Sequence, residues 1–100
     1  VLGSNAVGEV GVGTISPWIA SPAQVGTATW KTLSVGYSAA CAVNSADKLW
    51  CWGYNSSGQL GDGTGTNRSV PTAVGTASWT SVAMGFAHTC GLRTDSTLWC

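Results

Sequence analysis

The sequence predicts an all-β chain made of two tandem antiparallel repeats of about 50 residues each. Three observations lead to this prediction. A set of Gly, Asn and Thr residues recurs along the chain at matched spacing. Short runs of aromatic and β-branched residues alternate with clusters of Gly, Asn, Asp and Ser, which is typical of strands joined by turns. No stretch shows convincing helical periodicity.

The two copies match along most of their length, which defines residues 1–51 as repeat 1 and residues 52–100 as repeat 2. The clearest matched pairs are Gly3/Gly53, Asn5/Asn55, Trp30/Trp79, Gly36/Gly85, Cys41/Cys90, Leu49/Leu98, Trp50/Trp99 and Cys51/Cys100. The glycines expected in equivalent turns are Gly8, Gly11, Gly13, Gly58, Gly61 and Gly63. A strand-rich, glycine-punctuated unit of this length is typical of a propeller blade or a stacked β repeat.

Each repeat is expected to contribute three strands that carry large apolar side chains, separated by short turns. The expected strands are 30–36, 37–43 and 48–52 in repeat 1, and 79–84, 87–92 and 97–100 in repeat 2. Residues 14–22 contain two prolines, and residues 65–69 contain no large apolar side chain. We therefore expect both segments to be loops, the second at a solvent-facing rim.

The cysteines flank predicted hairpins. A three-residue turn at 45–47 places Cys41 opposite Cys51 at a non-hydrogen-bonded position, where Cα atoms lie about 4.5 Å apart. The same register places Cys90 opposite Cys100. This separation lies within the disulfide range, at its short edge, and the same geometry occurs in both repeats. We therefore predict one disulfide within each repeat, which implies an oxidising compartment. Free buried thiols are the alternative, and zinc is disfavoured because the spacings are wider than usual for its ligands.

The composition limits the partners of the chain. Charged residues make up 8% of it, and four basic residues balance four acidic ones. No basic patch is therefore expected for nucleic acid or an anionic membrane surface. No apolar run is long enough to insert into a membrane. The abundance of small and hydroxyl-bearing residues favours an extracellular or cell-surface protein, of bacterial origin.

The titratable residues form no catalytic constellation. His88 is the single histidine and aligns with Ala39, so we expect a structural role for it. Gly61-Asp62-Gly63 supplies one carboxylate, which is too few oxygen ligands for calcium. No acidic pair recurs at equivalent positions among Glu9, Asp47, Asp62 and Asp95. We therefore expect no enzymatic activity, no metal and no cofactor.

The aromatic residues fall into two groups. Those that recur are expected to pack between blades together with two leucines, and this set is Trp30, Trp50, Trp79, Trp99, Leu49 and Leu98. Trp18 lies in the proline-containing loop outside the repeat pattern. Together with Tyr37 and Tyr54, it is a candidate for contact with a partner.

Several motifs resemble the repeat of the regulator-of-chromosome-condensation family, and the resemblance covers the whole chain. They are His88-Thr89-Cys90-Gly91-Leu92, Leu49-Trp50-Cys51-Trp52-Gly53-Tyr54-Asn55, Gly58-Gln59-Leu60-Gly61 and Pro71. Repeat 1 departs from the pattern, with Leu2 in place of the second Trp and Ala39-Ala40 in place of His-Thr. The resemblance implies β-propeller-type blades but says little about function, because its members perform unrelated tasks on one scaffold.

Two repeats leave two outer faces bare. If each exposes about two Trp-sized side chains, each face forfeits on the order of 10 kcal/mol. The chain begins and stops at positions equivalent to Cys51, within a predicted strand, so we expect a piece of a longer array or a processed repeat unit. Further repeats or other copies are expected to cover the bare faces, either as a closed propeller or as an open fibre.

Two functions follow from these expectations. The favoured one is a non-catalytic, self-assembling structural protein whose blades stack on other copies or repeats in an extracellular ring or fibre. The alternative is a fragment of a closed propeller that binds a specific protein through its loop face. Asn55 and Asn67 match the glycosylation acceptor pattern, and whether either carries a sugar is left open.

Overall fold

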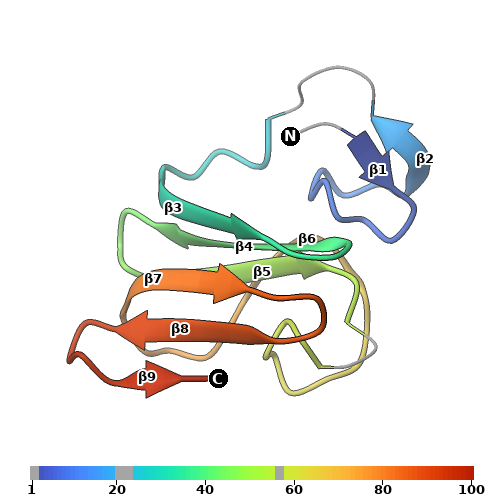
Figure 1. Ribbon diagram of the computed structural model, residues 1–100. Coiled ribbons are helices and arrows are strands. Elements are labelled where there is room, and N and C mark those ends of the chain that lie inside the picture. The colour runs from blue at the N-terminus through green and yellow to red at the C-terminus, as the bar shows by residue number, and fades with distance from the viewer. Residues whose placement is uncertain (1–2, 20–23, 56–57) are drawn as a thin grey trace.

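The computed structural model describes residues 3–19, 24–55 and 58–100, and their regular secondary structure consists of short strands (Figure 1). The strands are β1 (Gly3–Asn5), β2 (Ser16–Ile19), β3 (Trp30–Val35), β4 (Ala39–Asn44), β5 (Leu49–Gly53), β6 (Arg68–Ala73), β7 (Trp79–Met84), β8 (Thr89–Arg93) and β9 (Leu98–Trp99). Among these residues there is no helix of the length and apolarity needed to cross a bilayer.

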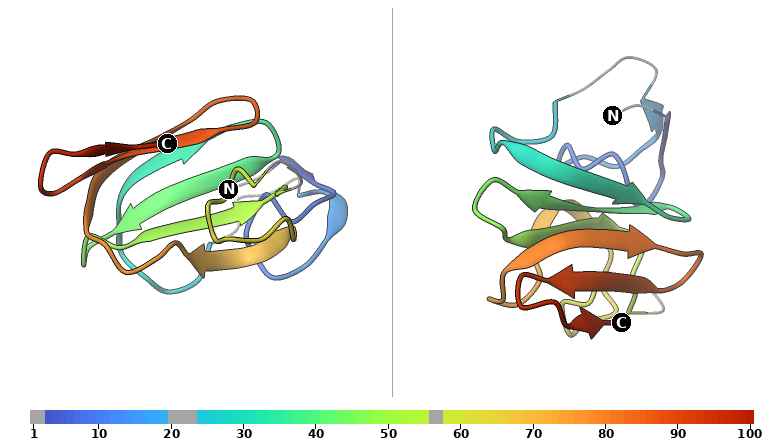
Figure 2. Two further views of the ribbon diagram at one scale, coloured as in Figure 1. Left: turned by 90° about the horizontal axis from the view of Figure 1, so that it is seen from below. Right: turned by 60° about the vertical axis from the view of Figure 1, so that its left-hand side comes forward.

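The strands form three antiparallel sheets, in the orders β1-β2, β3-β4-β5-β6 and β7-β8-β9. The middle sheet is a complete four-stranded blade. By repeat alignment, β1 and β2 correspond to the last two strands of such a blade, and β7 to β9 correspond to the first three. The β7–β9 sheet packs against the middle sheet through contacts of β7 with β3 and β4 (Figure 2).

The sequence repeats and the sheets are out of phase. The boundary between residues 51 and 52 lies within β5, and β6 of repeat 2 completes the sheet begun by repeat 1. Each four-stranded blade therefore needs residues from two consecutive sequence repeats. The division into 1–51 and 52–100 stays a prediction about sequence units.

Two segments predicted as loops contain strands. β2 lies within 14–22, and β6 begins inside 65–69. Pro17 in the first segment and Pro71, two residues after the second, hid the strands from a reading of the sequence pattern. β6 is the edge strand of its sheet, and an edge strand tolerates proline because one side of its backbone needs no ladder partner.

The main core lies between the middle sheet and the β7–β9 sheet. Side chains from β4, β5 and the β5–β6 loop meet side chains from β7. The buried members are Ala39, Cys41, Val43, Leu49, Cys51, Leu60, Trp79 and Val82. Two of the residues predicted to pack between blades, Leu49 and Trp79, lie in this core.

The opposite face of the middle sheet carries a second cluster. Trp52, Ala40 and Ala42 are buried there, and Trp30 and Trp50 pack against them. The Trp52 indole nitrogen donates a hydrogen bond to the Glu9 carbonyl oxygen at 3.0 Å. This contact ties the middle sheet to the segment between β1 and β2.

Equivalent residues differ in exposure according to whether a sheet covers them. Leu49 is 5% exposed beneath the β7–β9 sheet, whereas its counterpart Leu98 is 70% exposed. Trp99 and Leu92 on the β7–β9 sheet are exposed as well. Within the described residues, no further sheet lies on that side, so the predicted packing role of Leu98 and Trp99 stays a prediction.

Two disulfides link β4 to β5 and β8 to the residue after β9. Cys41 pairs with Cys51 at a Cα separation of 4.1 Å, and Cys90 pairs with Cys100 at 4.0 Å. The ladder has the predicted register, with Cys41 directly opposite Cys51. The disulfide prediction is thus confirmed. Each bond closes a short hairpin, for which the chain-entropy model gives about 3 kcal/mol.

Candidate interaction surface

Two equivalent turns stand at the same end of neighbouring sheets, on the right in Figure 1. One joins β3 to β4, and the other joins β7 to β8. In the first, Gly36 N–H donates to the Ala39 carbonyl at 2.9 Å, and in the second, Gly85 N–H donates to the His88 carbonyl at 2.8 Å. The strand predicted to begin at residue 37 therefore begins at Ala39.

The two turns lie in direct contact. A Cβ atom at Gly36 would lie 2.7 Å from the Gly85 carbonyl oxygen, so a side chain there would force the turns apart. The Met84 N–H also donates to the Ser34 hydroxyl oxygen at 2.9 Å, across the two sheets. These contacts hold the residue after Gly36 and the residue after Gly85 beside each other.

Those following residues are Tyr37 and Phe86, whose rings stack with centroids 4.5 Å apart and planes 28° from parallel. Tyr37 is 61% exposed and Phe86 is 70% exposed. The pair presents apolar area to solvent on short, hydrogen-bonded turns. Exposed aromatic residues on a rigid support are typical of protein interfaces.

Of the predicted contact residues, Tyr37 and Tyr54 lie at this end. The Tyr54 N–H donates to the Ser38 carbonyl at 2.8 Å, which holds the start of the β5–β6 loop beside the β3–β4 turn. Trp18 belongs to β2, but its side chain lies outside the described part of the chain. Phe86 was missed by sequence reasoning, although its alignment with Tyr37 was available as a signal.

His88 supports the β7–β8 turn. A Cβ atom at Gly85 would lie 2.4 Å from the His88 Nε2 atom, so the imidazole lies directly over the glycine backbone. This geometry agrees with the structural role expected from the sequence. In the described ranges no three His, Cys, Asp or Glu side chains gather where they would hold a metal ion.

A buried asparagine organises the β5–β6 loop at the same end. Asn55 is fully buried, and its Nδ2 group donates to the carbonyl oxygens of Thr64 and Thr66, both at 2.9 Å. Its Oδ1 atom accepts a hydrogen bond from the Leu60 N–H at 3.0 Å. The Asn55 side chain is therefore unavailable as a glycan acceptor once the chain has folded.

Asp62 adds an ion pair to the same loop. Its Oδ2 atom accepts from the Arg68 Nε at 3.0 Å, and its Oδ1 atom accepts from the Thr64 hydroxyl at 2.7 Å. Burial raises the pKa of the Asp62 carboxyl, but hydrogen bonds from Thr64, Arg68 and Asn55 outweigh burial and lower the pKa to about 2. The loop therefore holds Asp62 in its ionised form.

This shift predicts a loss of stability in acid. The lowered pKa means that the stabilising contribution is complete above the ordinary value of 3.8 and is lost as pH falls toward about 2. Between pH 5 and pH 2, the free energy of unfolding of the native chain should fall by about 2 kcal/mol more than that of the Asp62→Asn variant. Urea denaturation at both pH values checks this, and equal losses for the two proteins would contradict it.

The remaining charged groups gather mainly at the opposite ends of the sheets, around the β4–β5 and β8–β9 turns. Lys31 pairs with Asp47 there, and the Lys48 ammonium donates to the Thr76 carbonyl at 3.1 Å. Hydrogen bonds from Thr97 lower the pKa of the exposed Asp95 carboxyl. The end that carries Tyr37 and Phe86 is thus the more apolar one.

A series of antiparallel sheets that repeat the same strand pattern and pack face to face defines a β-propeller-type repeat protein. Two family models described as the regulator of chromosome condensation (RCC1) repeat match residues 46–92 and 30–59. Taken together, the matches span residues 30–92. The chain belongs to the RCC1 repeat family.

Solved structures share this fold. Yeast RCC1 (Prp20), solved with Kap60 bound, matches with a TM-score of 0.81 and 16% identity, over 97% of this chain and 26% of that chain. Human WBSCR16 matches with a TM-score of 0.61 and 28% identity, over 64% of this chain and 16% of that one. The present chain therefore spans about a quarter or less of these structures. A search of curated proteins found no match.

Proposed function

We propose that this chain is a non-catalytic segment of a β-propeller that binds another protein through the sheet ends around Tyr37 and Phe86. The observation that carries the proposal is the stacked, solvent-exposed aromatic pair at equivalent positions of two neighbouring sheets. The Kap60 complex of yeast RCC1 supports it by example, since there a protein of this fold is bound to another protein.

The geometry of the pair suits a binding anchor. Aromatic side chains dominate the energetics of many protein interfaces, and they lose little conformational entropy on binding when their backbone is already fixed. The turns that carry Tyr37 and Phe86 are fixed by hydrogen bonds and by the contact between Gly36 and Gly85. The partner surface expected here is an apolar protein pocket, because the chain has no net charge to attract nucleic acid.

The disulfides bear on where such binding takes place. Cys41–Cys51 and Cys90–Cys100 would be reduced in most cytosolic compartments. We therefore include an extracellular or cell-surface location in the proposal. The two hairpin cross-links are its sole structural support.

Assembly of copies is a second candidate function, favoured by one observation. Leu33 and Val35 on β3 are exposed, whereas their counterparts Val82 and Met84 pack into the core against the middle sheet. The exposed Leu98 lies on the β7–β9 sheet, beyond that core. The β7–β9 sheet of one copy could thus cover the exposed β3 side chains of another copy. The complex of yeast RCC1 with Kap60 favours protein binding over assembly of copies.

Site-specific photo-crosslinking of the full chain in its native source tests both candidates. A photoreactive amino acid replaces Tyr37, and the control positions are Ala46 in the charged β4–β5 turn and Leu98. Position 37 is expected to give a discrete adduct with another protein, which Phe86→Ala abolishes, while position 46 gives none.

Other outcomes of the same experiment separate the candidates. An adduct of the chain with itself from position 98 would favour assembly. An adduct from position 37 that survives Phe86→Ala, or no adduct there, would contradict binding through the aromatic pair.

A further inference from the structure

Two triplets of the sequence match the acceptor pattern for N-linked glycosylation, and they are Asn55-Ser56-Ser57 and Asn67-Arg68-Ser69. Both asparagines lie between β5 and β6, and they are in direct contact. The Asn67 Oδ1 atom accepts a hydrogen bond from the Asn55 N–H at 2.8 Å. Their side chains nevertheless lie in different surroundings, and this difference decides which of them can carry a sugar in the folded protein.

Asn67 lies on the surface. It is exposed, and so are the residues before it from position 63 onward. Because a backbone N–H donates to an oxygen and not to an amide nitrogen, the hydrogen bond from Asn55 fixes which way the Asn67 amide is turned. The Nδ2 atom is therefore the free end of the side chain. Among the described residues, it makes no hydrogen bond.

A sugar on this Nδ2 atom is compatible with the folded loop. N-linkage replaces one of the two Nδ2 hydrogens and leaves the amide oxygen unchanged. The hydrogen bond between the Asn67 Oδ1 atom and the Asn55 N–H is thus kept. A glycan is bulky and needs a surface position, which the exposed residues beside Asn67 provide.

The Asn55 side chain has the opposite environment. It is fully buried, and its Nδ2 group donates to the carbonyl oxygens of Thr64 and Thr66 and to the Asp62 Oδ1 atom at 3.2 Å. A sugar would replace one of the Nδ2 hydrogens that these acceptors use, and it would need space in the interior of the loop. The fold therefore accepts a glycan at one of the two triplets and rejects it at the other.

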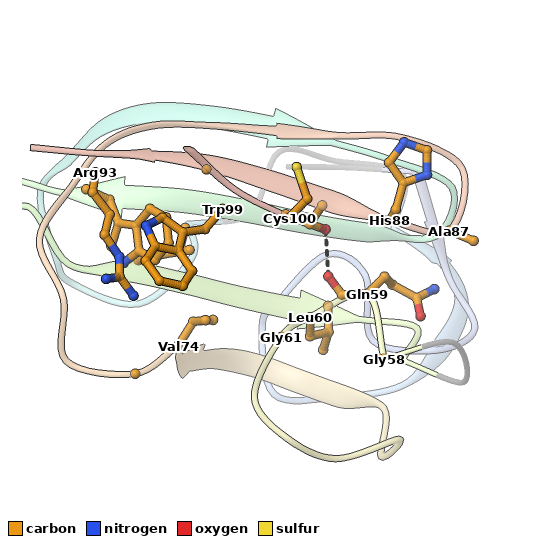
Figure 3. Close-up of a pocket in the computed structure, with 15 residues that line it drawn as sticks. Gly58, Gln59, Leu60, Gly61, Val74, Ala87, His88, Arg93, Trp99 and Cys100 are labelled. Atoms are coloured by element: carbon orange, nitrogen blue, oxygen red, sulfur yellow. Dashed lines mark hydrogen bonds between the residues drawn. The ribbon is translucent and has the colours of Figure 1, made fainter. Parts of the chain in front are cut away.

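Contacts on both sides of the exposed segment hold it at the surface. On the inner side, the Gln59 carbonyl oxygen accepts a hydrogen bond from the Thr89 hydroxyl at 2.6 Å, which attaches the loop to β8 (Figure 3). At the outer end, the Arg68 Nε atom pairs with the Asp62 carboxylate at 3.0 Å. The position of Asn67 outside the core is thus set by the fold of the loop.

The third residue of this triplet can be changed without disturbing its contacts. A Cβ atom at Gly8 would lie 2.5 Å from the Ser69 Cα atom, so the two backbones pack closely. The Gly13 N–H donates to the Ser69 carbonyl oxygen at 2.8 Å. In the part of the chain that the structure describes, the Ser69 hydroxyl makes no hydrogen bond. Ser69→Ala therefore removes the hydroxyl that the acceptor pattern requires and keeps the backbone contacts.

We propose that Asn67 is an N-glycosylation site of this protein and that Asn55 is not. The donor is an oligosaccharide linked through C1 of its first sugar to a lipid diphosphate. The Asn67 Nδ2 atom forms a bond to this C1 atom, the bond between C1 and the diphosphate oxygen breaks, and the proton lost from Nδ2 passes to the leaving diphosphate. The proposal rests on the location outside the cytosol proposed above and is independent of the Tyr37–Phe86 pair.

Peptide mass spectrometry of the full chain, purified from its native source, tests the proposal. Electron-transfer fragmentation leaves a sugar on its side chain, so a peptide that contains both asparagines shows which of them is modified. We expect hexose or N-acetylhexosamine mass on Asn67 and none on Asn55. An unmodified Asn67, or a sugar on Asn55, would overturn the proposal.

Digestion without reduction separates this proposal from the proposed location, because the same sample reports the Cys41–Cys51 disulfide. An unmodified Asn67 together with an intact disulfide would overturn glycosylation alone. An unmodified Asn67 together with free cysteines would overturn both glycosylation and the location outside the cytosol.

Two variants expressed in the same source provide the matched comparison. Ser69→Ala should abolish the sugar mass on Asn67, whereas Ser57→Ala, which removes the other acceptor triplet, should leave it unchanged. Sugar that persists on Asn67 in Ser69→Ala would contradict N-glycosylation through this triplet. The measurement on the unaltered chain needs no variant to fold.

Discussion

Replacing Trp52 with alanine is expected to lower the free energy of unfolding by about 4 kcal/mol. Trp52 is among the largest fully buried side chains of the described residues. The substitution leaves a cavity against Trp30, Ala40 and Ala42, and it removes the donor to the Glu9 carbonyl. It thus breaks one of the contacts between the β1–β2 segment and the middle sheet, where the Gly13 N–H also donates to the Ser69 carbonyl at 2.8 Å. Urea denaturation followed by far-UV circular dichroism, with disulfides intact, measures the change.

Trp99→Ala is the matched control for Trp52→Ala. Trp99 is half exposed, and its side chain contacts the Arg93 guanidinium and donates to the Thr97 hydroxyl at 2.8 Å. Its loss should cost about 1 kcal/mol, the scale of an exposed cation–π contact. Equal costs for the two substitutions would show that burial between sheets does not determine the stability of this chain.

Asn55→Ala is expected to cost about 3 kcal/mol, because it removes the partner of three backbone groups at once, among them the buried Leu60 N–H. The substitution removes the donors to the Thr64 and Thr66 carbonyls and the acceptor for the Leu60 N–H. The β5–β6 loop should then open locally. Hydrogen exchange of the Leu60 amide should accelerate, and urea denaturation should show the lower free energy of unfolding.

Asn44→Ala provides the comparison for Asn55. Asn44 also accepts two backbone hydrogen bonds, from Ala46 and Lys48, but it lies in a half-exposed turn where water can replace it. The expected cost is about 1 kcal/mol. If Asn55→Ala left Leu60 exchange unchanged, the asparagine would not be what orders the loop.

Much of the fold could be predicted from the sequence, because the repeat and the hairpins are local features. The spacing of Cys41 and Cys51 around a short turn fixes their register, and the ladder follows it. The strand at Arg68–Ala73 was missed, because Pro71 breaks the strand pattern and the edge position that permits it is set by distant β5. Edge placement is a tertiary property that local pattern does not encode.

The candidate surface was predicted in part. Tyr37 and Tyr54 were expected to contact a partner, and the structure places both at one end of the sheets. The stacking of Tyr37 on Phe86 depends on the close approach of Gly36 to Gly85, which belong to different sheets. Sequence alone gives the equivalence of the two positions but not the distance between them. We propose protein binding in place of the self-assembly that was preferred from the sequence alone.

The most direct test of the central claim is a double-mutant cycle on the partner recovered by crosslinking at position 37. Tyr37→Ala and Phe86→Ala should each weaken binding at least about tenfold, which is about 1.4 kcal/mol. Because the rings contact each other, the double variant should lose less than the sum of the two single losses. Full affinity in a folded double variant would contradict the account, since the aromatic pair would then carry none of the binding.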